Sequence, residues 1–141
     1  MGKSINKFVL MIVLITSIGF LTAATIKNDL NNKLSEWVAP KSANNIKNPL
    51  AGNVKAALEG KKLFKQMCAI CHGNKGKGDG MAGMALKPKP TDFTLKKVQS
   101  QADGAIFWKL TEGRAPMASY KKTLAETRRW QLVNYIRTLK R

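Results

Sequence analysis

The stretch that decides the fold is Cys68-Ala69-Ile70-Cys71-His72, a C-x-x-C-H motif. On a helix, cysteines three residues apart lie on nearly the same face, so Cys68 and Cys71 can present both thiols to one planar group. Each thiol can add across one vinyl group of a haem, which gives two thioether bonds. His72 follows directly, and its imidazole can reach under the ring to take one axial position on the iron. The motif therefore predicts covalent attachment of a c-type haem.

The chain has only two cysteines and one histidine, and this count weighs against a zinc site, a redox pair or a disulfide at the motif. A structural zinc site needs four Cys or His ligands, whereas this chain offers three. A thioredoxin-like redox pair needs a preceding strand in a βαβ unit, which the sequence does not predict. A disulfide between Cys68 and Cys71 would close an awkward short loop and would leave His72 without a role.

Methionine is the expected second axial ligand, because His72 is the only histidine. Met/His ligation is the electron-transfer arrangement that raises the reduction potential. Met117 lies in a proline-containing loop, residues 113–120, far enough along the chain to cover the opposite face of the haem. Met81 and Met84, in a glycine-rich loop just after the motif, are the alternatives. Filling the core is the ordinary role of any methionine.

From about residue 53 to residue 141, the chain resembles a class I, single-haem cytochrome c of the exported, bacterial type. The resemblance rests on the haem motif, the methionine loop and the two terminal helices. It implies an all-α fold of about three to four helices wrapped around one covalently attached haem c. The cofactor-binding residues would be Cys68, Cys71, His72 and Met117, of which His72 and Met117 would bind the iron.

A helix crossing is part of the same resemblance. The family pattern places a glycine and an aromatic residue eight and four positions before the first cysteine, and Gly60 and Phe64 stand there. Glycine lets two helix backbones meet because it has no Cβ. The resemblance implies that these two residues contact Leu132 and Tyr135 of the C-terminal helix.

Two further features follow from the resemblance, and one departs from it. The segment around Pro88 and Pro90 looks like the family's proline loop, so a backbone carbonyl there would accept the second imidazole proton and orient the ligand. Trp108 and Arg114 are candidates for contacts with the haem propionates, although ordinary packing and solvation are equally expected. The family often has proline directly after its ligand methionine, whereas this chain has Ala118.

The N-terminus carries a targeting segment, because Lys3 and Lys7 precede an apolar run over residues 8–24. A basic start before such a run is typical of an export signal. The run lies at the border between a cleavable peptide and a spanning helix of about 17–25 residues. Residues 1–24 are therefore predicted to be a signal peptide or an uncleaved membrane anchor. Both place the folded part in the periplasm or on the extracytoplasmic face of the cytoplasmic membrane.

Two more parts follow the targeting segment. Residues 25–52 are rich in Asn and Lys and contain two prolines, which predicts a polar leader or tether. The alternative is that Trp37 docks this arm on the domain or on a partner. Residues 53–141 form the expected cytochrome c domain, consistent with one domain for a chain of 141 residues.

Helical periodicity runs through this domain, and no stretch alternates with the period of a strand. Asn53 is expected to cap a helix that leads into the haem motif. Asp103 is expected to cap a second helix, which ends at Gly113. Thr123 and Glu126 match a capping box that would open a third helix near the C-terminus.

Residues 78–83 match the G-x-G-x-x-G pattern of dinucleotide-binding loops. That fingerprint requires a strand before it and a helix that opens from it. Here the haem-bearing helix precedes the pattern and the proline loop follows. Asp79 alone cannot make a calcium site. We therefore expect these glycines to form a turn against the haem edge.

The chain is strongly basic, with 25 Lys and Arg against 8 Asp and Glu and a formal net charge of +17. Such charge often indicates nucleic acid, but an exported haem domain rarely meets it, so we expect no nucleic-acid partner. Simple solubility and an anionic membrane surface are alternatives. Docking on an acidic redox protein fits better, because lysines around the haem edge would steer the encounter. The candidates are Lys65, Lys75, Lys77, Lys87, Lys89, Lys121 and Lys122.

The expected function is that of a one-electron carrier between respiratory-chain partners, and not an enzyme, because both axial positions are filled. One alternative is a haem-binding subunit of a larger oxidase or dehydrogenase complex. Another is a ligand-activating haem protein with an open iron position, which requires that Met117 does not bind. A domain this small buries a modest core, so we expect the haem-free polypeptide to be largely unfolded.

Overall fold

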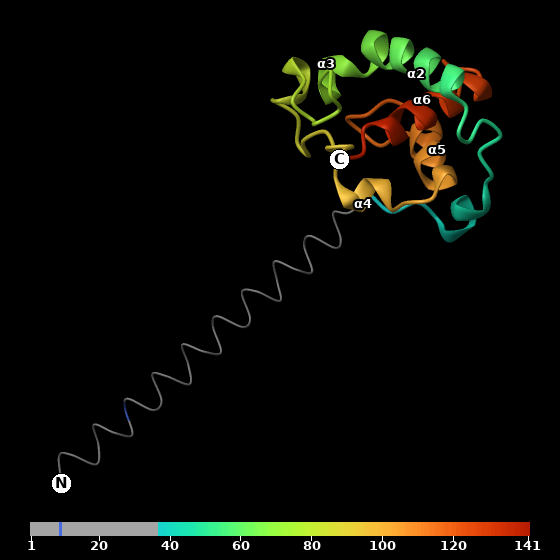
Figure 1. Cartoon of the computed structure of the whole chain (residues 1–141). Coiled ribbons are helices and arrows are strands. Elements are labelled where there is room, and N and C mark those ends of the chain that lie inside the picture. The colour runs from blue at the N-terminus through green and yellow to red at the C-terminus, as the bar shows by residue number, and fades with distance from the viewer. Residues whose placement is uncertain (1–8, 10–36) are drawn as a thin grey trace. The chain divides into compact units, whose positions relative to one another are not determined.

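The computed structural model describes Val9 and residues 37–141, and its compact domain runs from Ala39 to Arg141. Within that domain the elements are helical and joined by loops, and no strand is present (Figure 1). This confirms the predicted all-α fold. The elements are η1 (Lys41–Asn45), α2 (Val54–Met67), α3 (Ala69–His72), η2 (Met81–Gly83), α4 (Lys96–Gln99), α5 (Asp103–Glu112) and α6 (Glu126–Thr138).

Helices α2 and α6 cross at Gly60, as the resemblance predicted. A Cβ atom at residue 60 would lie 1.9 Å from the carbonyl oxygen of Gln131 and 3.0 Å from the Cβ of Tyr135. One turn further along α2, the rings of Phe64 and Tyr135 are in contact, with centroids 5.0 Å apart. Leu132, the other predicted partner, is fully buried in the same hydrophobic cluster as Phe64 and Tyr135. The close approach of the two backbones therefore depends on the missing side chain at Gly60.

The core lies between α2, α5 and α6, and α6 contributes more buried side chains to it than any other helix. Trp130 of α6 stacks on Phe107 of α5, with ring centroids 3.9 Å apart and an angle of 13° between the planes. This stacking fixes α5 against α6, and the crossing at Gly60 fixes α2 against α6. The largest fully buried side chains are those of Trp130, Phe64, Leu132, Ile136 and Val133.

One predicted helix cap is confirmed and a second is wrong. The side chain of Asn53 accepts a hydrogen bond from the backbone N–H of Ala56, 2.9 Å away, and so caps α2. Helix α5 begins at Asp103 itself, with Ala102 in the cap position and no capping side chain. The Asp103 carboxylate instead accepts a hydrogen bond from Nε of Arg137, at 2.7 Å. An ion pair with a residue far along the chain thus replaces the local cap.

The predicted capping box at Thr123 is also wrong. Helix α6 begins at Glu126, with Ala125 in the cap position and no capping side chain. The segment before it forms a turn in which the N–H of Leu124 donates to the carbonyl of Tyr120, at 3.0 Å. The Glu126 carboxylate points forward along α6 and accepts a hydrogen bond from the indole of Trp130, at 3.3 Å. Thr123 therefore lies in the turn and not at the helix end.

Part of the predicted tether packs on the domain, which begins at Ala39 and not at residue 53. Helix η1 lies against α5, where a Cβ atom at Gly104 would be 2.1 Å from the carbonyl oxygen of Ala43. The amide of Asn48 donates to the Asp103 carboxylate at 2.7 Å and to the Asn134 side chain at 2.8 Å. These contacts attach residues 39–52 to both α5 and α6.

No helix within residues 37–141 is both long and apolar enough to cross a membrane. The predicted signal or anchor segment, residues 1–24, lies outside the described residues except for Val9, and so does the start of the predicted tether.

Candidate functional site

The C-x-x-C-H motif occupies the end of α2 and the single turn of α3. The N–H of Cys68 donates to the carbonyl of Phe64 at 2.8 Å, so Cys68 continues the helical path of α2. The N–H groups of Cys71 and His72 both donate to the carbonyl of Cys68, at 3.2 Å and 2.9 Å. Both thiols are free. The two cysteines therefore lie one helical turn apart, as attachment to a single planar group requires.

Cys68 is buried and Cys71 is partly exposed. Burial, and to a lesser degree the nearby charge of Cys71, raises the pKa of the Cys68 thiol to about 12. Among residues 37–141, no group of three or more His, Cys, Asp or Glu side chains is arranged to hold a metal ion.

His72 is oriented by a backbone carbonyl and an aromatic ring. Its Nδ1 lies 3.3 Å from the carbonyl oxygen of Thr91, and a carbonyl can only accept, so Nδ1 carries the hydrogen. Phe93 stacks on the imidazole, with ring centroids 4.4 Å apart. Burial lowers the His72 pKa, and the hydrogen bond to Thr91 opposes this. The neutral imidazole therefore keeps a free lone pair on Nε2, which is the form that binds iron.

The orienting carbonyl belongs to Thr91 and to neither of the two prolines considered from the sequence. Thr91 directly follows Pro90, so the right segment was predicted but not the right residue. The reason lies in the glycine loop: a Cβ atom at Gly78 would lie 2.2 Å from the Pro90 carbonyl oxygen. The Pro90 carbonyl thus faces the backbone of Gly78, and the next carbonyl along the chain faces His72.

The glycine loop packs on the backbone of the motif. A Cβ atom at Gly80 would lie 2.4 Å from the carbonyl oxygen of Ile70, and one at Gly83 would lie 2.2 Å from that of Cys71. Helix α3 precedes this loop, and the single turn η2 lies within it. The loop is therefore a close-packed turn beside the haem motif, and it lacks the strand that a dinucleotide site requires.

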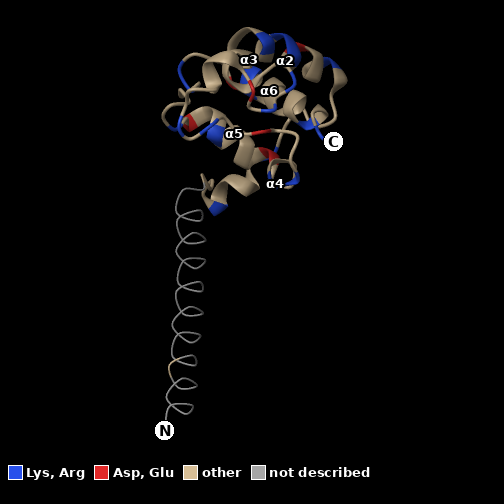
Figure 2. Ribbon diagram, turned by 90° about the vertical axis from the view of Figure 1, so that its left-hand side faces the viewer, with Lys and Arg blue, Asp and Glu red and all other residues tan. Residues whose placement is uncertain are grey.

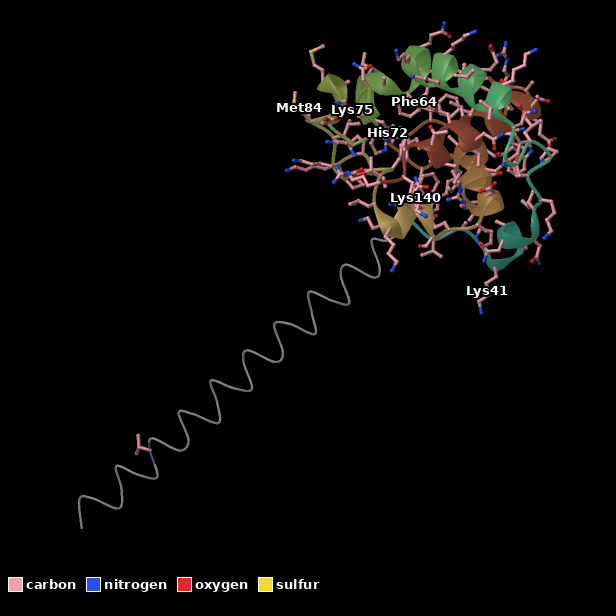
Figure 3. The ribbon with its side chains drawn as sticks, in the orientation of Figure 1. Lys41, Phe64, His72, Lys75, Met84 and Lys140 are labelled. Atoms are coloured by element: carbon pink, nitrogen blue, oxygen red, sulfur yellow. The ribbon has the colours of Figure 1, made fainter. Side chains whose placement is uncertain are left out.

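Met117 differs from the two rival methionines in its burial. It is partly buried and packs against the core. Backbone hydrogen bonds of 3.0 Å and 2.9 Å with Arg114 close a tight turn around it. Met81 and Met84 are 79% and 65% exposed, and Figure 3 shows Met84 at the outer edge of the molecule. Of the three, Met117 is the best placed to face a buried group.

Tyr120 places the methionine loop close to the motif. Burial raises the pKa of its hydroxyl, and the nearby charges of Cys68 and Cys71 raise it further. Tyr120, three residues after Met117, therefore lies near enough to the two cysteines for their charges to act on its hydroxyl. Binding of the Met117 sulfur to iron stays a prediction.

The residues present fit a covalently attached haem c. Two free thiols lie one turn apart, a neutral imidazole is held with Nε2 free, and a partly buried thioether lies on a nearby loop. The propionate candidates differ in exposure, because Trp108 is partly buried and Arg114 is exposed. The sequence did not predict the roles of the Thr91 carbonyl and the Phe93 ring. Every residue has a backbone carbonyl, so residue type does not indicate which carbonyl will orient the imidazole.

The surface around the motif is basic with exposed apolar side chains. Ile70, Met81 and Met84 are 61%, 79% and 65% exposed, and α3 packs on η2, which carries Met81. Figure 2 shows Lys and Arg distributed over the whole domain, including α2 beside the motif. All candidate docking lysines are exposed, namely Lys65, Lys75, Lys77, Lys87, Lys89, Lys121 and Lys122.

Comparisons with known proteins found a matching family model and a similar solved structure. A family model described as cytochrome c oxidase, cbb3-type, subunit III matches residues 55–136. Among solved structures, a chain of the Kuenenia stuttgartiensis reducing HAO-like protein complex Kustc0457/Kustc0458 is similar, with a TM-score of 0.60 and 30% sequence identity. The match covers 68% of this chain and 50% of that chain, so this chain spans about half the length of the relative. No curated protein matches the chain.

Proposed function

Because the chain belongs to the c-type cytochrome family described as cytochrome c oxidase, cbb3-type, subunit III, it is a haem c protein of electron transfer, and we propose that it carries single electrons between respiratory-chain partners. Cys68 and Cys71 would hold the haem, and His72 and Met117 would bind its iron. The bound haem supplies one-electron chemistry, because its iron changes between the ferric and ferrous states.

The observation that carries the proposal is the preparation of His72 as a ligand. The Thr91 carbonyl accepts from Nδ1, at 3.3 Å, and Phe93 stacks on the ring. A histidine that binds metal commonly donates its other N–H to such an acceptor, which fixes the tautomer and the ring orientation. In the folded domain these two contacts hold the imidazole with Nε2 free to bind iron.

The proposed second ligand, Met117, is supported by its partial burial and by the exposure of its rivals. The test is the absorption spectrum of the oxidised haem-loaded protein, where sulfur bound to iron gives a charge-transfer band at the red end. Met117→Leu should abolish this band and let the reduced protein bind carbon monoxide. The matched control, Met84→Leu, should keep the band. A band that survives Met117→Leu would refute the assignment, and a wild-type protein that binds carbon monoxide readily would favour a ligand-activating haem protein.

We propose further that the partner docks at the haem edge with an acidic surface. An apolar centre within a charged rim is the usual composition of an interface, and Ile70, Met81 and Met84 offer such a centre among exposed lysines. Electron-transfer rates with an acidic partner should fall steeply as ionic strength rises. Rates that do not change with added salt would count against charge-guided docking.

The basic N-terminus and its apolar run support export as a signal peptide or a membrane anchor, residues 1–24, with the domain outside the cytoplasmic membrane. Mass spectrometry of the exported protein tests this directly, because it reports both the first residue of the mature chain and the mass of one added haem. A protein that is found whole and without haem in the cytoplasm would contradict the proposal.

A permanent subunit of a redox enzyme complex is the second candidate function. The family description names an oxidase subunit, and the similar solved chain is part of a protein complex. The two candidates differ in the native assembly, which gentle extraction followed by size-exclusion chromatography measures. A free carrier elutes as a small haem protein, whereas a subunit elutes with its complex.

A further inference from the structure

The methionine loop is fastened to the last turn of α5. The hydroxyl of Ser119 donates to the carbonyl of Thr111 at 2.6 Å, and the N–H of Tyr120 donates to the carbonyl of Leu110 at 3.1 Å. The last four carbonyls of a helix have no partner within the helix. In α5, two of them are thus satisfied by the segment that follows Met117.

The two ends of the loop also touch. Gly113 ends α5 with a φ of +66°, which sends the chain away from the helix axis. A Cβ atom at Gly113 would lie 2.5 Å from the backbone nitrogen of Ser119 and 2.6 Å from the carbonyl carbon of Ala118. The loop over residues 113–119 is therefore closed at its base, with Met117 inside it.

The acceptor of the Ser119 hydrogen bond is itself fixed. Thr111 is buried, and its hydroxyl donates to the carbonyl of Phe107 at 2.8 Å and accepts from the guanidinium of Arg129 on α6. Arg129 is buried too, with its Cζ 4.8 Å from the centre of the Phe107 ring. Thr111 thus joins α5, α6 and the methionine loop, and its carbonyl offers Ser119 a rigid anchor.

We propose that Ser119 is a positioning residue for the second axial ligand. Met117 is held on one side by its paired hydrogen bonds with Arg114 and on the other by the bond from Ser119 to Thr111, with only Ala118 between. Loss of the Ser119 hydroxyl removes one of the two hydrogen bonds that fasten this second side to α5, which weakens the closure of the loop, while the bond from the Tyr120 N–H to the Leu110 carbonyl remains. This inference rests on the proposed ligand role of Met117.

The test uses imidazole, which competes with the methionine sulfur for ferric iron in the haem-loaded protein. A hydrogen bond of ordinary strength changes an opening equilibrium by about three- to tenfold, so Ser119→Ala should bind imidazole about three- to tenfold more tightly. Ser119→Thr keeps the hydroxyl and should restore the wild-type affinity. Ser100→Ala, which changes an exposed serine at the end of α4, should leave it unchanged.

The three outcomes separate this inference from the proposed function. If the wild type and Ser119→Ala both show the sulfur–iron band and bind imidazole equally, Ser119 has no positioning role although Met117 is the ligand. If Ser119→Thr behaves as Ser119→Ala does, the hydroxyl is not the active group and the inference is wrong. If the wild type lacks the band, the ligand assignment fails, and the role of Ser119 falls with it.

Discussion

Replacement of Gly60 by alanine tests the helix crossing that supports the site. The added Cβ would lie 1.9 Å from the carbonyl oxygen of Gln131, and contact normally begins near 3.4 Å, so α2 and α6 would have to separate by about 1.5 Å. The obstacle is backbone and cannot rotate away. Overpacking of this kind costs about 1–3 kcal/mol, and the better helix propensity of alanine returns about 1 kcal/mol.

We therefore expect Gly60→Ala to lower the free energy of unfolding by about 2 kcal/mol, taking the upper end of the overpacking range because backbone meets backbone. For a domain of this size, that loss lowers the melting temperature by about 8–16 °C. The assay is thermal and urea unfolding of the haem-loaded protein, followed by far-UV circular dichroism. Lys61→Ala, at the exposed neighbouring position of α2, is the control and should change stability by less than about 0.5 kcal/mol.

The sign of the change decides the test. Helix propensity without a clash predicts that Gly60→Ala stabilises the protein, because alanine is the better helix former. A melting temperature equal to or above that of the wild type would therefore refute the close approach of the two backbones.

Three further predictions concern the rest of the domain. Arg137→Met removes hydrogen bonds to the Asp103 carboxylate and to two backbone carbonyls, so urea unfolding should show a loss of about 2 kcal/mol; an unchanged midpoint would contradict this. Asp92→Ala removes the acceptor of two hydrogen bonds from Thr94, of which the side-chain bond does most to lower the Asp92 pKa. The Asp92 pKa is lower in the folded than in the unfolded protein, so these hydrogen bonds stabilise the fold at neutral pH and this stabilisation is lost as pH falls. The difference in the free energy of unfolding between Asp92→Ala and the wild type should therefore shrink below about pH 4. Haem-free polypeptide should be largely unfolded by circular dichroism, and a native-like helical spectrum would contradict this prediction.

The helix crossing could be predicted because spacing on a helix determines which residues share a face. Gly60 and Phe64 are one turn apart, and both face α6 in the structure. The same rule places Cys68 one further turn along, at the end of α2. Such predictions depend only on local geometry and on the resemblance, which names the facing helix.

The failed caps show the limit of local reasoning. Asp103 and Thr123 are residue types that favour a helix N-terminus, and both precede or begin a helical pattern. The Asp103 carboxylate instead accepts hydrogen bonds from Arg137 and Asn48, which are remote in the sequence. These bonds join α5, α6 and the segment before α2. Thr123 loses its place because the turn after Tyr120 delays the start of α6. The long-range partners of Asp103 cannot be recognised from the residues around it, and at Thr123 a competing local turn takes the place of the predicted cap.

The start of the domain was placed too late for a related reason. Residues 39–52 have the polar composition of a tether, and composition is all that a single sequence offers there. Their attachment depends on the amide of Asn48, which meets Asp103 and Asn134 from two different helices. Residue type alone does not distinguish an Asn in a tether from an Asn in a segment that packs on the domain.

The candidate haem site, too, could be predicted only in part from the sequence. The C-x-x-C-H motif predicted the chemistry of one haem face, whereas the structure shows what positions the two segments that carry the proposed axial ligands. Phe64 of α2 packs on Tyr135, and Phe107 of α5 stacks on Trp130, so the helix that leads to Cys68 and the helix that precedes Met117 both rest on α6. The separation of the two proposed axial ligands is therefore set by a helix that contributes neither of them. Substitutions at Tyr135 or Trp130 should therefore alter the site although neither residue contributes a proposed ligand.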